Sequence, residues 1–176
     1  VVTANPRSVS TYFDLASTYL DKGEVEPARQ ALAAVLKLDP QSARAYTMMG
    51  LIEARQERMD DAFKLVQRAI ELEPQFPDAY VDLSSLWERK GELAKAEAAV
   101  RTALQIVPTH TEARSRLGSI LLAKGDVSGA ETELREALKI DPYHAPTHRA
   151  LGILHDQAGQ FEEALREYQE ALKSQN

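Results

Sequence analysis

The chain has 176 residues, 44% of them hydrophobic and 27% charged, the balance of a folded protein. The net charge of −6 and the lack of any Lys/Arg cluster argue against a nucleic-acid-binding or anionic-membrane surface. The absence of cysteine excludes disulfides, thiolate metal sites and cysteine nucleophiles.

The sequence contains no recognisable targeting or membrane segment. No apolar run approaches the roughly 20 residues that a membrane-spanning helix needs, and no signal-peptide core is present. The chain begins with Val1 rather than with Met, so we interpret it as a fragment from which a targeting segment could have been removed. The composition therefore fits either the cytoplasm or the periplasm.

A period of 34 residues organises the chain from its N-terminus onward. It is marked by five prolines: Pro6, Pro40, Pro74, Pro108 and Pro142. Aligned on this period without insertion or deletion, the chain divides into five repeats: 9–42, 43–76, 77–110, 111–144 and 145–176. We interpret residues 1–8 as an N-terminal extension or as the tail of a preceding repeat.

Each repeat predicts two helices. In the second repeat, for example, helical periodicity covers residues 43–56 and residues 59–72. Small residues recur at the eighth place of the repeat and alanine at the twentieth, which lets the two helices approach closely. The second helix is expected to end just before the proline, because proline disfavours helical geometry in the residue that precedes it.

The turn between the two helices carries glycine in four of the five repeats, at Gly23, Gly91, Gly125 and Gly159. Glycine suits the left-handed residue that ends many helices. The second repeat has Glu57 at this place, and a positive φ there would cost on the order of 1 kcal/mol. We therefore expect the turn at Glu57 to be the least well formed of the five.

These positions resemble the tetratricopeptide repeat, and the resemblance extends over nearly the whole chain as five tandem copies. It implies an all-α fold, a right-handed superhelical α-solenoid of helix-turn-helix repeats whose first helices line the concave side. It also implies a protein–protein interaction module or scaffold rather than an enzyme. The expected partner is another protein, which places a peptide or a helix in the groove, and not a nucleic acid or a membrane interior.

The resemblance places the groove on the first helices. Its predicted residues are Phe13, Arg44, Leu51, Arg55, Val81, Arg89, Arg116, Leu122, Arg149 and Ile153. For any single arginine the alternative is an ion pair within the groove, for instance Arg55 with Asp78 or Arg89 with Glu112. Two specialised modes of the family are disfavoured, because no lysine occupies a carboxylate-clamp position and no asparagine lies on a first helix.

Three histidines are the strongest candidates for chemistry. His144, His148 and His155 have spacings of four and seven, which on one helix would place them on roughly one face. However, His148 and His155 occupy the fourth and eleventh places, where other repeats carry aromatic residues that pack between helices. We therefore expect no catalytic residue, no metal and no cofactor.

Two further interpretations stay open. The chain is either a stand-alone interaction module or the partner-recruiting or substrate-recruiting segment of a larger enzyme or membrane-assembly protein. In addition, Leu165, Tyr168 and Leu172 form an apolar stripe on the last helix, and we expect weak self-association through this C-terminal repeat.

Overall fold

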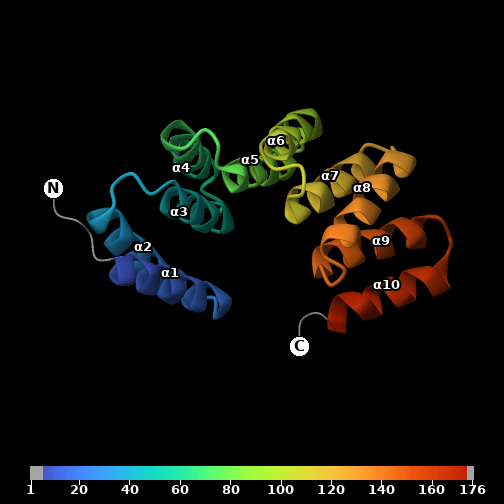
Figure 1. The fold of residues 1–176 in the computed structure, drawn as a ribbon, viewed down its shortest axis with the longest axis horizontal. Coiled ribbons are helices and arrows are strands. Elements are labelled where there is room, and N and C mark those ends of the chain that lie inside the picture. The colour runs from blue at the N-terminus through green and yellow to red at the C-terminus, as the bar shows by residue number, and fades with distance from the viewer. Residues whose placement is uncertain (1–5, 174–176) are drawn as a thin grey trace. The chain divides into compact units, whose positions relative to one another are not determined.

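The computed structural model describes residues 6–173, with side chains from Val9 onward. Within this range the protein consists of ten helices and contains no strand (Figure 1). They are α1 (Pro6–Asp21), α2 (Val25–Leu38), α3 (Ala43–Arg55), α4 (Met59–Leu72), α5 (Pro77–Arg89), α6 (Leu93–Ile106), α7 (Thr111–Ala123), α8 (Val127–Ile140), α9 (Ala145–Gln157) and α10 (Phe161–Lys173). The all-α fold predicted from the sequence is confirmed.

The helix bounds follow the 34-residue period. The first helices of repeats two to five begin at the predicted positions: Ala43, Pro77, Thr111 and Ala145. The predicted start is wrong for α1, which begins at Pro6 instead of near Val9. Proline is favoured in the first turn of a helix, where a backbone N–H would have no partner. Helix α1 therefore reaches into the segment interpreted as an extension, of which residues 1–5 lie outside the described part of the chain.

The second helices end where the prolines predict. The residues that follow α2, α4, α6 and α8 are Asp39, Glu73, Val107 and Asp141, and each precedes a proline. The backbone N–H of each still donates to the carbonyl four residues earlier, as Asp39 does to Val35 at 2.7 Å. The chain then turns into the next first helix.

The five hairpin turns are closed by the same pair of backbone hydrogen bonds. In the third repeat Gly91 donates to Glu88 at 2.9 Å and Glu92 donates to Trp87 at 2.9 Å. In the second repeat Glu57 donates to Ala54 at 3.2 Å and Arg58 donates to Glu53 at 3.0 Å. Both sets are Schellman motifs, although Glu57 has a φ of 63° without being glycine. These two distances are the longest of their kind among the five turns, in line with the expectation that this turn is the least well formed.

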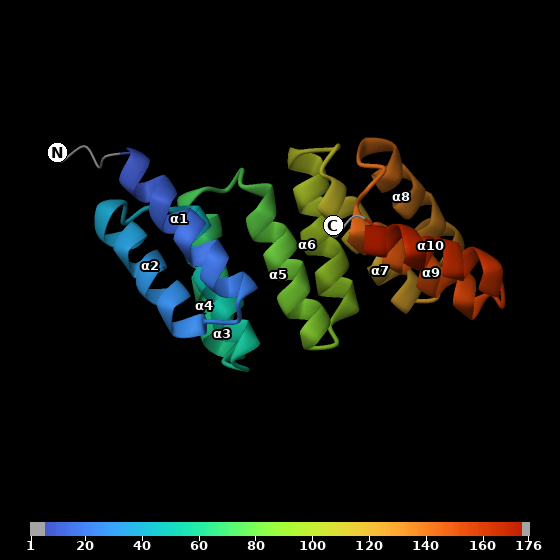
Figure 2. The ribbon, with the colours of Figure 1, turned by 90° about the horizontal axis from the view of Figure 1, so that it is seen from below.

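The packing of the chain divides it into two units, residues 1–82 (unit 1) and residues 83–176 (unit 2), and α5 crosses the boundary. In unit 1, α2 runs back alongside α1 and α4 alongside α3; in unit 2, α7 pairs with α8 and α9 with α10 (Figure 2). Alanine at the twentieth place is buried in every repeat, as expected for closely packed hairpins. The larger core residues include Leu32 and Ile52 in unit 1 and Ile120 and Leu134 in unit 2.

Close helix approach explains the small residues at the eighth place. A Cβ atom added to Gly118 of α7 would lie 2.6 Å from Cγ of Leu134 in α8. A Cβ atom added to Gly50 of α3 would lie 2.8 Å from Cγ2 of Val66 in α4. These separations are shorter than van der Waals contact, so the hairpins are packed too tightly there for any side chain.

Candidate protein-binding surface

The ten predicted groove residues all lie on first helices. Phe13 is on α1; Arg44, Leu51 and Arg55 are on α3; Val81 and Arg89 are on α5; Arg116 and Leu122 are on α7; Arg149 and Ile153 are on α9. Of these, the residues from Phe13 to Val81 belong to unit 1 and those from Arg89 onward belong to unit 2. Their accessibility differs greatly.

In unit 1 the predicted apolar residues are largely inside the core. Phe13 and Val81 are buried, and Leu51 is half-buried. The guanidinium carbon of Arg44 lies 4.4 Å from the centre of the Phe13 ring, so Arg44 covers this ring in a cation–π contact. Arg55 is exposed, and no described residue, Asp78 included, forms a hydrogen bond or an ion pair with it. The accessible features here are therefore two arginines on either side of Leu51.

In unit 2 the charge of Arg116 is compensated internally. Its guanidinium contacts Glu88 of α5 and Glu112 of α7, each at 3.0 Å. Glu112 also contacts Nε2 of His144 at 3.2 Å. Burial alone would raise the pKa of Glu112, but the His144 hydrogen bond and the Arg116 charge hold it below its usual value. Glu112 thus pairs with Arg116 and His144, not with Arg89.

A depression of about 360 Å³ lies over α7 and α9 in unit 2. Three of the predicted residues, Arg116, Arg149 and Ile153, line it together with Glu112, Ser119, Pro146 and Ala150. Ile153 is 41% exposed. Arg149 is also exposed and has no hydrogen-bond or ion-pair partner among the described residues. The depression therefore combines an uncompensated cation with apolar surface.

The three histidines contact different partners. His148 is buried, with Nδ1 2.7 Å from Glu167 of α10 and Nε2 2.9 Å from the carbonyl of Pro142. His144 Nδ1 lies 2.7 Å from Thr147, and His155 Nδ1 lies 2.6 Å from Gln160. Among residues 6–173 no group of three or more His, Asp or Glu side chains is arranged to hold a metal ion. The expectation of no metal and no cofactor stays a prediction.

The Pro142 contact belongs to a series that recurs along the chain. The side chain at the fourth place donates to the proline carbonyl six residues earlier: Tyr46 to Pro40 at 3.5 Å, Tyr80 to Pro74 at 3.1 Å, Arg114 to Pro108 at 3.0 Å. A carbonyl oxygen only accepts, so Nε2 of His148 carries a hydrogen. Its Nδ1 faces a carboxylate, which also only accepts. The imidazole therefore satisfies both partners only when it is protonated on both nitrogens.

Sequence reasoning missed a charged cluster in unit 1. Glu53 of α3 is buried and contacts both Arg29 of α2 and Arg58, the residue that precedes α4. The sequence does carry a signal for this cluster. Glu53 is an acidic residue at the eleventh place, where the other repeats hold Tyr, Trp, Leu or His. On α10 the stripe residues Leu165 and Leu172 are exposed, and self-association through them stays a prediction.

None of the helices within residues 6–173 is long and apolar enough to cross a membrane. The repeated hairpins and their phased small residues define a helical repeat protein. The family model of the cilia and flagella-associated protein 70 C-terminal domain matches residues 2–149, and the tetratricopeptide repeat model matches residues 145–175. The chain belongs to the tetratricopeptide repeat family. No curated protein sequence matches it.

Solved structures of this family have a similar fold. TTC0263, a thermophilic tetratricopeptide repeat protein of Thermus thermophilus, matches with a TM-score of 0.83 and 21% identity, over 94% of this chain and 91% of its own. PilW, described as a widely conserved type IV pilus biogenesis factor, matches with a TM-score of 0.78 and 23% identity, over 97% and 80%. YrrB, described as a tetratricopeptide repeat protein with an unusual peptide-binding site, matches with a TM-score of 0.58 and 22% identity, over 93% and 84%.

Proposed function

We propose that this protein is a non-catalytic interaction module that binds a segment of a partner protein on the faces of its first helices. The observation that carries the proposal is the depression over α7 and α9, where exposed Ile153 lies one helical turn from Arg149. An unpaired cation beside apolar surface is a common anchor for a peptide, because the apolar contact supplies affinity and the charge supplies specificity.

Two properties support a site for a peptide rather than for a small molecule. The depression is a shallow surface feature, whereas small-molecule sites are concave and enclose most of their ligand. The Glu88–Arg116–Glu112 contacts also hold neighbouring side chains of α5 and α7 in place before a partner arrives, which lowers the entropic cost of binding. The peptide-binding site named for YrrB fits the same class of function.

Selection of peptides from a random library on the immobilised chain tests the proposal. Selected peptides should bind an Arg149→Glu, Ile153→Glu variant at least about tenfold more weakly, since loss of an apolar anchor and a charge costs at least ~1.4 kcal/mol. Arg135→Glu on α8 is the matched control, because Arg135 is exposed and, among the described residues, pairs only with Glu131 of its own helix. If peptides bind both variants as tightly as the unchanged chain, the first-helix face of unit 2 is not the binding surface.

A further inference from the structure

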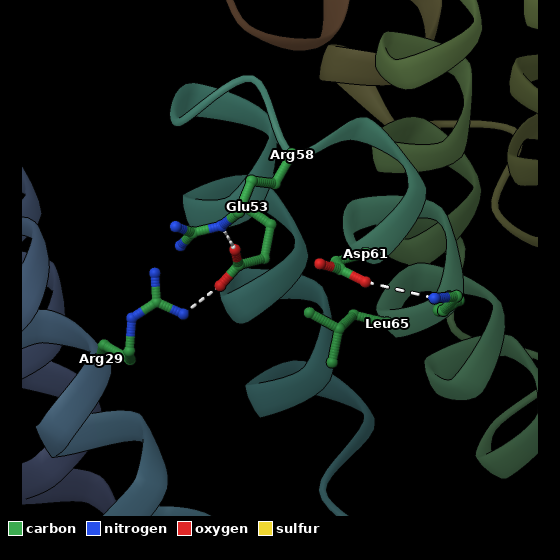
Figure 3. Close-up of a pocket in the computed structure, with 6 residues that line it drawn as sticks. Arg29, Glu53, Arg58, Asp61 and Leu65 are labelled. Atoms are coloured by element: carbon green, nitrogen blue, oxygen red, sulfur yellow. Dashed lines mark hydrogen bonds and ion pairs between the residues drawn. The ribbon is translucent and has the colours of Figure 1, made fainter.

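Two arginine side chains in unit 1, Arg29 and Arg58, are held next to one another by Glu53 (Figure 3). The carboxylate of Glu53, only 5% exposed, accepts hydrogen bonds from Nη1 of Arg29 and Nε of Arg58. The Gln56 side-chain oxygen accepts from Nη2 of Arg29 at 2.9 Å and from Nη2 of Arg58. The two guanidiniums are therefore fixed in place by two shared acceptors.

The residues of this cluster are exceptions to the repeat. The other repeats have no basic residue at the place of Arg29, where they carry Phe63, Glu97, Glu131 and Leu165. They also have none at the place of Arg58, where they carry Glu24, Glu92, Asp126 and Gln160. Since these repeats form the same hairpins without the cluster, the hairpin architecture does not require it. Arg29 of the first repeat and Arg58 of the second nevertheless contact the same carboxylate, that of Glu53.

The cluster forms one wall of a pocket of about 440 Å³, which Asp61, Lys64 and Leu65 of α4 also line. The acids that line the pocket are already engaged: Glu53 by the two arginines, and Asp61 by Lys64 at 3.2 Å. A further acid, Glu26, lies 3.4 Å from Nε of Arg29.

The cationic side chains of the pocket have N–H donors that no described residue uses. Arg58 and Lys64 have side chains that are 47% and 77% exposed, and Nη1 of Arg58 has no hydrogen-bond partner among the described residues. Glu26, Glu53 and Asp61 balance the charges of Arg29, Arg58 and Lys64, so what the pocket offers a ligand is the unused N–H donors of Arg58 and Lys64 rather than a net positive charge.

Glu53 keeps its negative charge at neutral pH. Burial alone would raise the pKa of Glu53, but the hydrogen bonds from Arg58 and Arg29 lower it below the usual value for a glutamate. Glu53 thus stays ionised and keeps both guanidiniums oriented. A fixed guanidinium loses little conformational freedom when it binds a carboxylate, and its geometry suits one.

We propose that this pocket is a second protein-binding site, which takes an acidic side chain of a partner protein next to an apolar one. The partner carboxylate accepts hydrogen bonds from Nη1 of Arg58 and from the Lys64 ammonium group, and the apolar side chain packs on Leu65. The pocket is built by α2, the end of α3 and the start of α4, and it shares no residue with the predicted first-helix groove.

Titration with a synthetic peptide tests the site. The probe is acetyl-Glu-Glu-Leu-Glu-Glu-amide, and the same peptide with every Glu replaced by Gln is its uncharged counterpart. In NMR spectra the acidic peptide should shift the Arg58 Nε–Hε signal and the Leu65 methyl signals, and its affinity should fall as salt is added. Equal shifts by the two peptides, or no shift at Arg58 and Leu65, would overturn the proposal.

Variants make the test specific. Lys64→Gln should weaken the acidic peptide about fivefold, as expected for loss of one exposed charge contact. Lys139→Gln is the matched control, because Lys139 on α8 is 71% exposed and pairs with Glu136 three residues away, as Lys64 does with Asp61. Lys64 is largely solvated, so its replacement leaves the fold intact. An unchanged affinity in Lys64→Gln would refute the site.

The two binding surfaces can be separated. The Arg149→Glu, Ile153→Glu variant should bind the acidic peptide as the unchanged chain does, even if the proposed function of the first-helix face fails its own test. Loss of acidic-peptide binding in that variant would assign the peptide to α9 and would refute a site at Arg58.

Discussion

Arg58 contacts Glu53 twice, once through the backbone and once through the side chain. Its N–H donates to the Glu53 carbonyl at 3.0 Å, and its Nε donates to the Glu53 carboxylate. Both contacts span the turn in which Glu57 adopts a φ of 63°. The side-chain contact therefore ties together the two ends of the hairpin turn that lacks glycine.

Glu57→Gly should stabilise unit 1 by roughly 0.5–1 kcal/mol. Glycine removes the penalty of about 1–2 kcal/mol for a left-handed residue and adds about 0.5–1 kcal/mol of unfolded-state entropy. The free energy of unfolding from urea titrations followed by circular dichroism measures the difference. The reciprocal variant, Gly91→Glu, is the control and should lower the free energy of unfolding by about 1 kcal/mol. In that turn Glu92 occupies the place of Arg58, so no arginine contact offsets the strain. A destabilised Glu57→Gly variant would show that Glu57 itself contributes a favourable contact.

Glu53→Ala should destabilise the protein by about 2–3 kcal/mol. It leaves two guanidiniums without their shared anion, and the cost stays below that of a fully buried pair because Arg58 can regain water. Replacing Glu53 and Arg29 together by leucine should recover most of this loss, since Leu121 and Leu165 occupy these two places in other repeats. If the double replacement is no more stable than Glu53→Ala, the ion pair is not the main role of Glu53. The comparison again uses urea titrations.

Gly118→Ala should destabilise the protein by about 1–3 kcal/mol, although alanine is the better helix former by about 1 kcal/mol. The added methyl group would lie 2.6 Å from Cγ of Leu134, which is fully buried, so the core around it would have to shift. Ala16 occupies the same place in the first repeat, and Ala16→Gly should be destabilising too. Thermal melting of both variants checks these signs, and a higher melting temperature for Gly118→Ala would contradict the tight packing.

The stability of the last hairpin should fall as the pH rises through the His148 titration. Burial opposes protonation of His148, but the hydrogen bonds to Glu167 and to the Pro142 carbonyl outweigh it and raise its pKa; Glu167 and Glu170 are the acids that act on it. A raised folded-state pKa means that the stabilisation is fully present below about pH 6.5, the unfolded value. It is lost above that, as the pH passes the folded-state pKa.

His148→Arg should remove this dependence, because arginine stays charged at all these pH values. Arg114 already makes the equivalent contacts in the fourth repeat, to Glu133 at 2.7 Å and to the Pro108 carbonyl at 3.0 Å. His155→Gln is the control and should keep the dependence of the unchanged chain. Unfolding free energies between about pH 5.5 and pH 8.5 decide the matter, and an unaltered slope in His148→Arg would assign the titration to another group.

Local patterns in the sequence were sufficient to determine the hairpins. The period predicted where α3, α5, α7 and α9 begin, since each helix start depends on residues within a few positions of it. The turn at Glu57 shows the limit of such reasoning. The residue type predicted a strained turn, in line with the positive φ of Glu57 and its long closing hydrogen bonds, but it did not predict that the side chain of Arg58 contacts Glu53 across the turn.

The tertiary structure alone decided which charges are paired and which side chains are accessible. Arg116 meets Glu88 from a position 28 residues away, and Arg29 meets Glu53 from 24 residues away. Such pairs depend on how neighbouring helices pack, and the 3.6-residue period of one helix carries no information about the residues opposite it. For the same reason the family resemblance placed Phe13 in the groove, whereas the packing of α1 buries it beneath Arg44.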